Sequence, residues 1–258
     1  MVLSRIFKSR IQPPAPARVP DGVRVYAIGD IHGRSDCLDE LLAAIRQESL
    51  YTTTEVRLVF LGDLIDRGPD SRGVVERLMA LAEGPQRCDF IKGNHEELLL
   101  LAAQGEQSAL SVFHRAGARE TMLSYGVMED EYDQCDLQGL SELIVRHVPQ
   151  AHLDFMESFV DRVSIGDYRF VHAGVRPGRS FEEQVAGDLR WIRREFLEHR
   201  QAFDGMVVHG HTIADEPEFE PNRIGIDTGA YATGRLTALG LEGERRWTLQ
   251  SQAAPATV

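Results

Sequence analysis

The chain is poor in cysteine and has no long apolar run. Its 258 residues include three cysteines, Cys37, Cys88 and Cys135, which are too few and too scattered for a disulfide framework or a paired-cysteine metal site. No stretch is long enough for a membrane span, and no hydrophobic segment follows the basic N-terminus as it would in a signal peptide. We therefore expect a protein of the reducing cytoplasm that has no membrane partner.

Basic charge is also scarce, since the formal net charge at pH 7 is −12. A surface that binds nucleic acid needs a basic face, so this charge argues against a nucleic-acid partner. It leaves phosphate substrates open, because bound divalent ions reverse the sign of the field locally. The 43% of hydrophobic residues is enough for one α/β domain with a substantial core.

The two ends of the chain differ in composition from the rest. Residues 1–20 carry four prolines, Pro13, Pro14, Pro16 and Pro20, and predict a flexible or extended arm. Residues 251–258 predict a disordered tail. Between them, residues 21–250 predict a single domain without internal repeats.

Four short blocks join carboxylate or imidazole side chains to glycine. They are GDIHG at 29–33, GDLIDRG at 62–68, GNHE at 93–96 and HGHT at 209–212. Each follows a β-prone run, at 23–28, 56–61, 90–91 and 206–208, and a fifth run at 168–171 precedes His172. Helical periodicity at Leu38–Ile45 and Val74–Met79 gives an alternation of strand and helix. Because open α/β sheets gather their loops at the carboxyl ends of strands, we expect these polar residues to meet there.

Two further regions complete the predicted elements. Residues 96–163 predict a mainly helical insert that packs beside the sheet or covers the cleft. Residues 223–250 predict strands joined by glycine-rich turns.

The polar blocks have the composition of a two-metal centre. Asp30 and His32 stand two apart and can reach one ion, and Asp63 can bridge two ions with its two oxygens. Asn94, His172 and His211 would complete the second ion. Mixed oxygen and nitrogen ligands favour Mn, Fe or Zn. Two such ions, about 3.5–4 Å apart, clamp a phosphoryl group and hold a hydroxide in line for attack.

The remaining polar residues of the blocks suit phosphate chemistry. Arg67 can offer a forked pair of donors to phosphate oxygens. His95 could protonate the leaving group, with Asp66 to orient it, and Arg193 or Arg194 would supply a second guanidinium. Each residue alone also has an ordinary structural role, as a turn former, a helix start or a core histidine. The role of His209 stays open between support of the ligands and plain strand-end structure.

Taken together, the blocks resemble the calcineurin-like metallophosphoesterases, and among these the bacterial and phage-type serine/threonine protein phosphatases. The resemblance rests on the four blocks, on HAG at 172–174 and on Ile226–Ala230, and spans roughly residues 23–240. It implies an α/β fold, an α+β sandwich of two mixed β-sheets flanked by helices, with a di-metal site at the C-terminal ends of the strands. Ile213 stands where many broader members of the superfamily have a histidine that binds the first metal, which favours the phosphoprotein-phosphatase branch.

The resemblance also implies a role for each matching residue. The metal ligands would be Asp30, His32, Asp63, Asn94, His172 and His211. The catalytic residues would be His95, Asp66, Arg67 and Arg193, and substrate would contact Arg67, Arg193, Asn94 and Tyr231. The cofactors would be two divalent ions, with Mn expected in vitro and Fe or Zn as alternatives.

Three functions follow from these expectations. The first is a phosphomonoesterase, in particular a serine/threonine protein phosphatase, that works by direct attack of a metal-bridging hydroxide. The second is hydrolysis of dinucleoside polyphosphates such as diadenosine tetraphosphate. Asp66 argues against it, because the symmetrical hydrolases of that substrate resemble this chain but tend to lack this aspartate. The third is a non-catalytic scaffold that binds phosphoproteins, which the complete ligand set disfavours. We expect a monomer whose partner is a phosphoprotein or a small phosphate ester.

Overall fold

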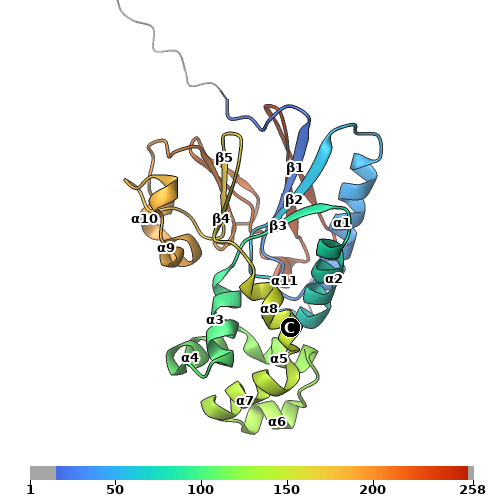
Figure 1. Ribbon diagram of the computed structural model, residues 1–258, viewed down its shortest axis with the longest axis vertical. Helices are drawn as coiled ribbons and strands as arrows, with labels where there is room; N and C mark the ends of the chain where they lie inside the picture. Colours follow the sequence, from blue (N-terminus) through green and yellow to red (C-terminus); the bar gives the residue numbers. More distant parts are fainter. Residues whose placement is uncertain (1–15, 255–258) are drawn as a thin grey trace, which may run out of the picture.

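The computed structural model describes residues 16–254 and contains two five-stranded sheets that face each other (Figure 1). The first sheet has the order β10-β9-β1-β2-β3, and the second has the order β4-β5-β6-β8-β7. Both sheets mix parallel and antiparallel pairs: β1 pairs with β2 in parallel and with β9 antiparallel, and β5 pairs with β6 in parallel and with β4 antiparallel. The predicted α/β sandwich of two mixed sheets is confirmed.

The strands of the first sheet are β1 (Val23–Ile28), β2 (Glu55–Phe60), β3 (Arg87–Phe90), β9 (Thr237–Glu242) and β10 (Arg245–Gln250). The strands of the second sheet are β4 (Arg162–Ile165), β5 (Tyr168–Val171), β6 (Met206–His209), β7 (Glu218–Phe219) and β8 (Arg223–Gly225). Every run that the sequence predicts before a polar block contains or overlaps a strand, apart from Ile91, which forms an isolated bridge with Val160.

Strand β1 shows how the sequence builds the core on both of its faces. Val25 and Ala27 point into the apolar layer between the two sheets, and Tyr26 and Ile28 point toward the helices on the outer face. All four side chains are fully buried. A strand that is covered on both faces reads as a continuous apolar run rather than as an alternating one.

Helices cover the outer faces of both sheets and form a separate lobe below them (Figure 1). The first sheet is covered by α1 (Ser35–Ser49) and α2 (Ser71–Glu83), and the second by α9 (Ala186–Trp191) and α10 (Arg194–Leu197). The lobe consists of α3 (Asn94–Ala103), α4 (Gln107–Ala116), α5 (Ala118–Ser124), α6 (Glu129–Gln134), α7 (Leu137–His147) and α8 (Gln150–Glu157). A short helix, α11 (Ala230–Thr233), follows β8. The predicted helical insert is therefore present, and it ends before β4 begins at Arg162.

The predicted arm and tail extend too far into the chain. Residues 1–15 and 255–258 lie outside the described residues, but 16–20 and 251–254 are packed against the domain. Val19 is fully buried, and its N–H donates to Gly243 O at 3.1 Å. Ser251 is 1% exposed, and its hydroxyl donates to Gly234 O at 2.8 Å. These hydrogen bonds to two glycine turns fix segments whose composition alone suggests disorder.

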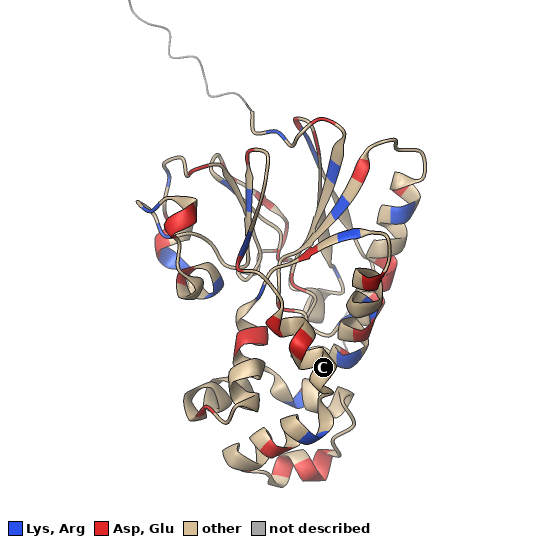
Figure 2. Cartoon of the chain, in the orientation of Figure 1, with Lys and Arg blue, Asp and Glu red and all other residues tan. Residues whose placement is uncertain are grey.

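Acidic side chains gather at the far end of the helical lobe (Figure 2). Helix α6 has the sequence EDEYDQ, with four carboxylates in six residues. Such a surface repels a phosphate backbone, in line with the negative net charge of the chain. Among residues 16–254, no helix has both the length and the apolar character that a membrane span requires.

Candidate active site

The backbone of the polar blocks is strained at several of the predicted site residues. Five non-glycine residues of the described chain have a left-handed φ: His32 at 46°, Asp63 at 52°, Asp66 at 72°, Arg67 at 69° and His211 at 62°. All five are predicted site residues. Each such conformation costs about 1–3 kcal/mol and persists only where the surroundings fix it, which is typical of functional sites.

Asp63 lies between two groups of imidazoles. Its Oδ2 atom is 3.6 Å from His32 Nε2 and 3.7 Å from His95 Nε2, and its Oδ1 atom is 3.4 Å from His172 Nε2. Two sets of three ligand atoms each fit within 4.8 Å: His32, Asp63 and His95, and Asp63, His172 and His211. One carboxylate shared by two clusters is the arrangement that a pair of bridged ions requires.

Backbone carbonyls orient two of these imidazoles. His32 Nδ1 lies 2.7 Å from Ile65 O, and His172 Nδ1 lies 2.9 Å from Leu61 O, so each Nδ1 donates its proton there. The Nε2 atom of each ring is then a free acceptor. His172 Nε2 faces further acceptors, because Asn94 Oδ1 is 2.9 Å away and Asp63 Oδ1 is 3.4 Å away. A cation between these atoms would remove their mutual repulsion.

Burial keeps the same imidazoles neutral. It lowers the pKa of His172, lowers that of His32 well below its usual range, and lowers that of His211 to about 2, despite the opposing charge of Asp63. Neutral imidazole is the form that binds a metal ion. The Nε2 atom of His32 is buried without a hydrogen-bond partner among the described residues, which fits an atom that holds an ion. His211 turns its Nδ1 atom toward the second cluster, 3.1 Å from His172 Nε2.

Asp30 contributes a carboxylate from the other side. Its Oδ2 atom accepts a hydrogen bond from the N–H of His211 at 2.9 Å, and its Oδ1 atom is buried with no described partner. A Cβ at Gly210 would lie 2.0 Å from Asp30 Oδ1, so only glycine fits at that position. Burial, Asp227 and Asp63 raise the pKa of Asp30, and burial raises that of Asp227 to about 6. The donor set thus fits two divalent ions of the Mn, Fe or Zn type.

Glu96 is a buried carboxylate for which the sequence predicts no role. It is fully buried, and its two oxygens accept the N–H groups of Asp63 at 2.9 Å, Leu64 at 2.8 Å and Gly93 at 2.9 Å. Glu96 therefore fixes the strained backbone at Asp63 and ties the second block to the third. The signal for this role is its place as the last residue of GNHE, at the first turn of α3, where a carboxylate is favoured.

His95, Asp66 and Arg67 converge beside the Asp63 carboxylate. His95 Nδ1 is 2.6 Å from Asp66 Oδ2, and Arg67 Nη2 is 3.1 Å from His95 Nε2. Burial alone would lower the pKa of His95, but the carboxylates of Asp63 and Asp66 outweigh it and raise this pKa. The Arg67 guanidinium lies over the ring of Tyr231, 5.1 Å from its centroid. The structure thus brings His95, Asp66, Arg67 and Tyr231 to one place beside Asp63.

Arg193 and His209 lie at the margin of this centre. Arg193 is exposed at the start of α10, and its side chain makes no hydrogen bond or ion pair with the described residues. Burial is the main cause of the lowered pKa of His172 and His211, and the charge of Arg193 adds to it, which places Arg193 near the second cluster. His209 is fully buried against Phe196, with ring centroids 4.9 Å apart.

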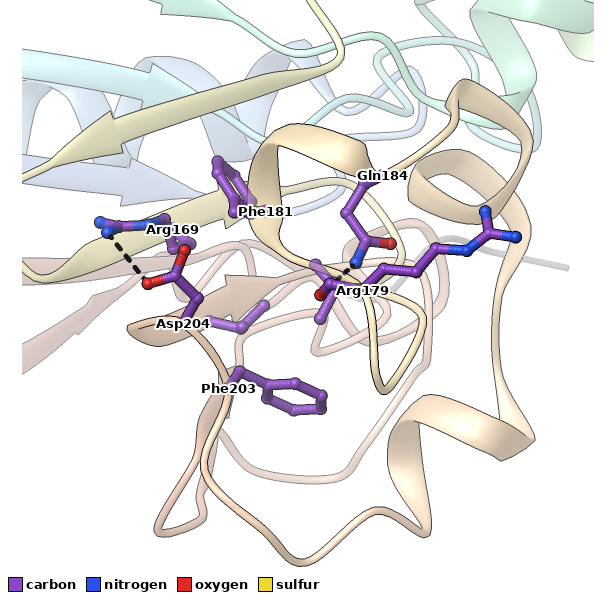
Figure 3. Close-up of a pocket in the computed structure, with 8 residues that line it drawn as sticks. Arg169, Arg179, Phe181, Gln184, Phe203 and Asp204 are labelled. Atoms are coloured by element: carbon purple, nitrogen blue, oxygen red, sulfur yellow. Dashed lines mark hydrogen bonds and ion pairs between the residues drawn. The ribbon is translucent and has the colours of Figure 1, made fainter.

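Two cavities of the described chain lie away from the centre. The one in Figure 3 has a volume of about 10 Å³ and lies over the outer face of the second sheet, where Arg169 faces Asp204 at 3.9 Å beside Phe181. The other, of about 310 Å³, lies between α3, α7 and α8 and is lined by residues that include Leu100 and Val148. No predicted site residue lines either cavity.

Several known proteins are similar to this chain over most of its length. A bis(5'-nucleosyl)-tetraphosphatase of the asymmetrical type from Oceanobacillus iheyensis is 28% identical over 228 residues, which cover 84% of this chain and 88% of that protein. Its counterpart from Anoxybacillus flavithermus is 29% identical over 230 residues, 82% of this chain and 88% of that protein. A symmetrical bis(5'-nucleosyl)-tetraphosphatase from an Acidovorax species is 32% identical over 187 residues, 70% of this chain and 56% of that protein.

Solved structures share the fold at lower identity. A provisionally named diadenosine tetraphosphatase superposes with a TM-score of 0.62 at 22% identity, over 94% of this chain and 97% of that one. A serine/threonine phosphatase from Saccharomyces cerevisiae superposes with a TM-score of 0.53 at 14% identity, over 94% of this chain and 85% of that one. Residues 23–235 match the calcineurin-like phosphoesterase family, whose members are hydrolases that use divalent metals. The predicted family is thus confirmed: this chain is a calcineurin-like metallophosphoesterase.

Proposed function

We propose that this enzyme hydrolyses dinucleoside polyphosphates at a di-metal centre built on Asp63. The observation that carries the chemistry is the Asp63 carboxylate between two ligand clusters, with His32 Nε2 3.6 Å away on one side and His172 Nε2 3.4 Å away on the other. The substrate class is supported by the relatives named bis(5'-nucleosyl)-tetraphosphatase, which align with most of this chain. They support the dinucleoside polyphosphate alternative over protein substrates.

The metal ligands are proposed by position and chemistry. Asp30 and His32 would hold one ion, Asn94, His172 and His211 would hold the other, and Asp63 would touch both. Mn is the ion to supply first in vitro, with Fe and Zn as alternatives. When bound, the two ions supply Lewis-acid charge that stabilises the phosphoryl oxygens and activates water for attack.

The side chains around the ions would bind and orient the phosphate chain. Arg67 can present two parallel N–H donors to phosphoryl oxygens, and its contact with the Tyr231 ring holds the guanidinium in place. Arg193, exposed near the second cluster, offers a second guanidinium. Two such groups suit a polyphosphate, which carries charge on several neighbouring phosphates, and Tyr231 limits the positions that the substrate can take.

A second candidate function is the hydrolysis of phosphoserine, phosphothreonine or phosphotyrosine in proteins. It is favoured by the hydrogen bond between His95 Nδ1 and Asp66 Oδ2, 2.6 Å long. A nucleotide that leaves from a polyphosphate is already a stabilised anion and needs little help from an acid. A serine or threonine alkoxide is strongly basic and needs a proton as it leaves, which His95 could provide.

The two candidates separate by direct comparison of substrates. We expect kcat/KM for diadenosine tetraphosphate, with Mn²⁺ supplied, to exceed that for a phosphoserine peptide by at least about 10-fold. Nucleotide analysis tells the cleavage mode, since asymmetrical cleavage gives AMP and ATP and symmetrical cleavage gives two ADP. The opposite ranking would move the assignment to protein substrates. If neither substrate nor p-nitrophenyl phosphate reacted, the scaffold hypothesis would replace both.

A further inference from the structure

A helix of the insert holds the loop that carries Asp66. Thr121 lies on α5, 55 residues beyond Asp66 in the chain, and is fully buried. Its hydroxyl donates to Asp66 Oδ1 at 2.6 Å and accepts the N–H of Asp66 at 2.9 Å. The side chain and the backbone of the same aspartate are therefore fixed by one residue of the insert.

The hydrogen atoms of this cluster can be assigned by counting donors. Thr121 has one hydroxyl hydrogen, and it goes to the Asp66 carboxylate because a hydrogen bond to a charged acceptor is the stronger one. Ser71 Oγ, 2.9 Å from Thr121 Oγ1, then donates to Thr121. The chain of hydroxyls occupies Asp66 Oδ1 and leaves Oδ2 for His95 Nδ1 at 2.6 Å.

The same part of the insert also holds Arg67. The N–H of Arg67 donates to Gly117 O at 3.2 Å, and a Cβ at Gly117 would lie 2.7 Å from Arg67 N and 2.9 Å from Arg67 Cγ. Asp66 and Arg67 have a left-handed φ of 72° and 69°. Two neighbouring non-glycine residues in this conformation need external support, and the junction of α4 and α5 supplies it.

We propose that Thr121 is a positioning residue of the reaction, which aims Asp66 at His95 so that His95 Nε2 faces the leaving oxygen. The helical insert then belongs to the catalytic machinery, although no group of α5 is assigned a contact with substrate. This inference rests on the proposed role of His95 as a proton donor.

Phenyl phosphate and p-nitrophenyl phosphate test the inference, because their leaving groups differ in how strongly they need a proton from an acid. Phenolate is a poorer leaving group than p-nitrophenolate and depends more on an acid. We expect Thr121→Val to lower kcat for phenyl phosphate by about 10-fold more than kcat for p-nitrophenyl phosphate, which is part of the ~10²–10⁴-fold contribution of a general acid. Thr121→Ser keeps the hydroxyl and should restore the wild-type ratio. If Thr121→Val did not fold, Thr121→Ala would carry the same expectation without the added methyl group.

Ser124 provides a matched control on the same helix. Its hydroxyl accepts the N–H of Arg72 at 3.1 Å and donates to Thr121 O at 2.7 Å, with no contact to Asp66. Ser124→Ala should leave the ratio of the two substrates unchanged. In a His95→Asn background, Thr121→Val should add no further loss, because the effect of Thr121 acts through His95.

The ring proton of His95 gives a readout that does not depend on turnover. In metal-free protein, the Nδ1–H of His95 should give a downfield proton resonance that is absent from His95→Asn, shifts upfield in Thr121→Val and returns in Thr121→Ser. An equal loss on both substrates together with an unchanged His95 resonance would overturn the inference. A wild-type enzyme inactive on the aryl phosphates, on the phosphoserine peptide and on diadenosine tetraphosphate would instead overturn the proposed function, and the resonance would still decide the role of Thr121.

Discussion

Asp30 accepts a hydrogen bond from the backbone N–H of His211 at 2.9 Å, and this contact joins the end of β1 in the first sheet to the end of β6 in the second. The other oxygen of Asp30 is buried with no described partner. Burial is the main cause of the raised pKa of Asp30, and the nearby Asp227 adds to it. Two neighbouring buried carboxyl groups bind protons more tightly than isolated ones, and a bound cation would favour release of these protons.

The first prediction concerns these protons. Metal loading should release protons from the Asp30–Asp227 pair rather than from imidazole, because the pKa values of Asp30 and Asp227 are raised whereas burial lowers those of His32, His172 and His211. Calorimetric titration with Mn²⁺ in buffers of different ionisation enthalpy measures the release. It should decline as pH rises, since the pair loses its proton without metal, and Asp227→Asn should reduce it. A release that Asp227→Asn leaves unchanged would contradict this assignment.

The second prediction concerns His95 itself. His95→Asn should lower kcat/KM for a phosphoserine peptide by about 10²–10⁴-fold, because the alkoxide then leaves without a proton. The loss on p-nitrophenyl phosphate should be much smaller, since p-nitrophenolate is stable as an anion. Steady-state kinetics with both substrates measures the difference. Equal losses would assign His95 a binding role instead.

The third prediction concerns the shared carboxylate. Asp63→Asn should reduce the bound Mn²⁺ per chain and lower turnover by at least about 100-fold. Replacing a residue that only hydrogen-bonds to a metal ligand typically costs about 10–100-fold. The reason for the larger loss is that Asp63 faces both imidazole clusters, so no other side chain replaces it. Metal analysis after gel filtration measures the stoichiometry. His147→Asn, on α7 in the insert, is the control and should retain both properties. Full metal content in Asp63→Asn would rule out a bridging role.

The fourth prediction concerns acid stability. Burial lowers the pKa of His209 from its usual 6.5 to about 4. Between these values the unfolded chain binds a proton that the folded chain does not, so stability is lost as pH falls from 6.5 to 4, by up to about 3 kcal/mol. Urea unfolding of metal-free protein at pH 7 and pH 5 should show a smaller pH effect in His209→Gln. The remaining buried histidines are common to both proteins, so their contribution cancels in the comparison.

The fifth prediction compares two glycines of the insert. Gly117 and Gly126 both have a positive φ, of 114° and 90°, but a Cβ at Gly126 would meet nothing within 4 Å. Gly117→Ala should therefore lower both the free energy of unfolding, by about 1–3 kcal/mol, and turnover, because it displaces Arg67. Gly126→Ala should cost stability alone. Thermal unfolding and steady-state kinetics measure the two effects, and full activity in Gly117→Ala would show that this contact with Arg67 is dispensable.

The sequence predicts those parts of the fold that repeat a local pattern. The run Val23–Ile28 is a strand with these same bounds, and Asp70 caps α2 through the N–H of Gly73 at 3.0 Å. Helix α1 begins at Ser35, and its N-cap, Arg34, makes no side-chain hydrogen bond to the helix, so no local capping contact marks this end. The buried face of this helix, which includes Leu38, Leu41 and Ile45, stabilises it without a cap.

Residues that act across long stretches of sequence escape prediction. Thr121 and Ser71 support Asp66 only because α5 packs against the start of α2, and a lone threonine in a helix has no distinguishing neighbour. Glu96 is different, since it stands in a block that already contains predicted ligands. Val19 shows a different kind of error. The four prolines of residues 1–20 predict an extended arm, but Val19 within it is fully buried in the domain.

The position of the ligands has a consequence for the integrity of the molecule. The three cysteines, Cys37, Cys88 and Cys135, are free thiols, so no covalent bridge links the two halves of the sandwich. Asp30 and His211, 181 residues apart, come from different sheets. Two metal ions, one bound by Asp30 and the other by His211, would link the two sheets and so close a very long loop of the chain. The melting temperature should then rise with free metal concentration, and chelation should loosen one sheet from the other before either unfolds.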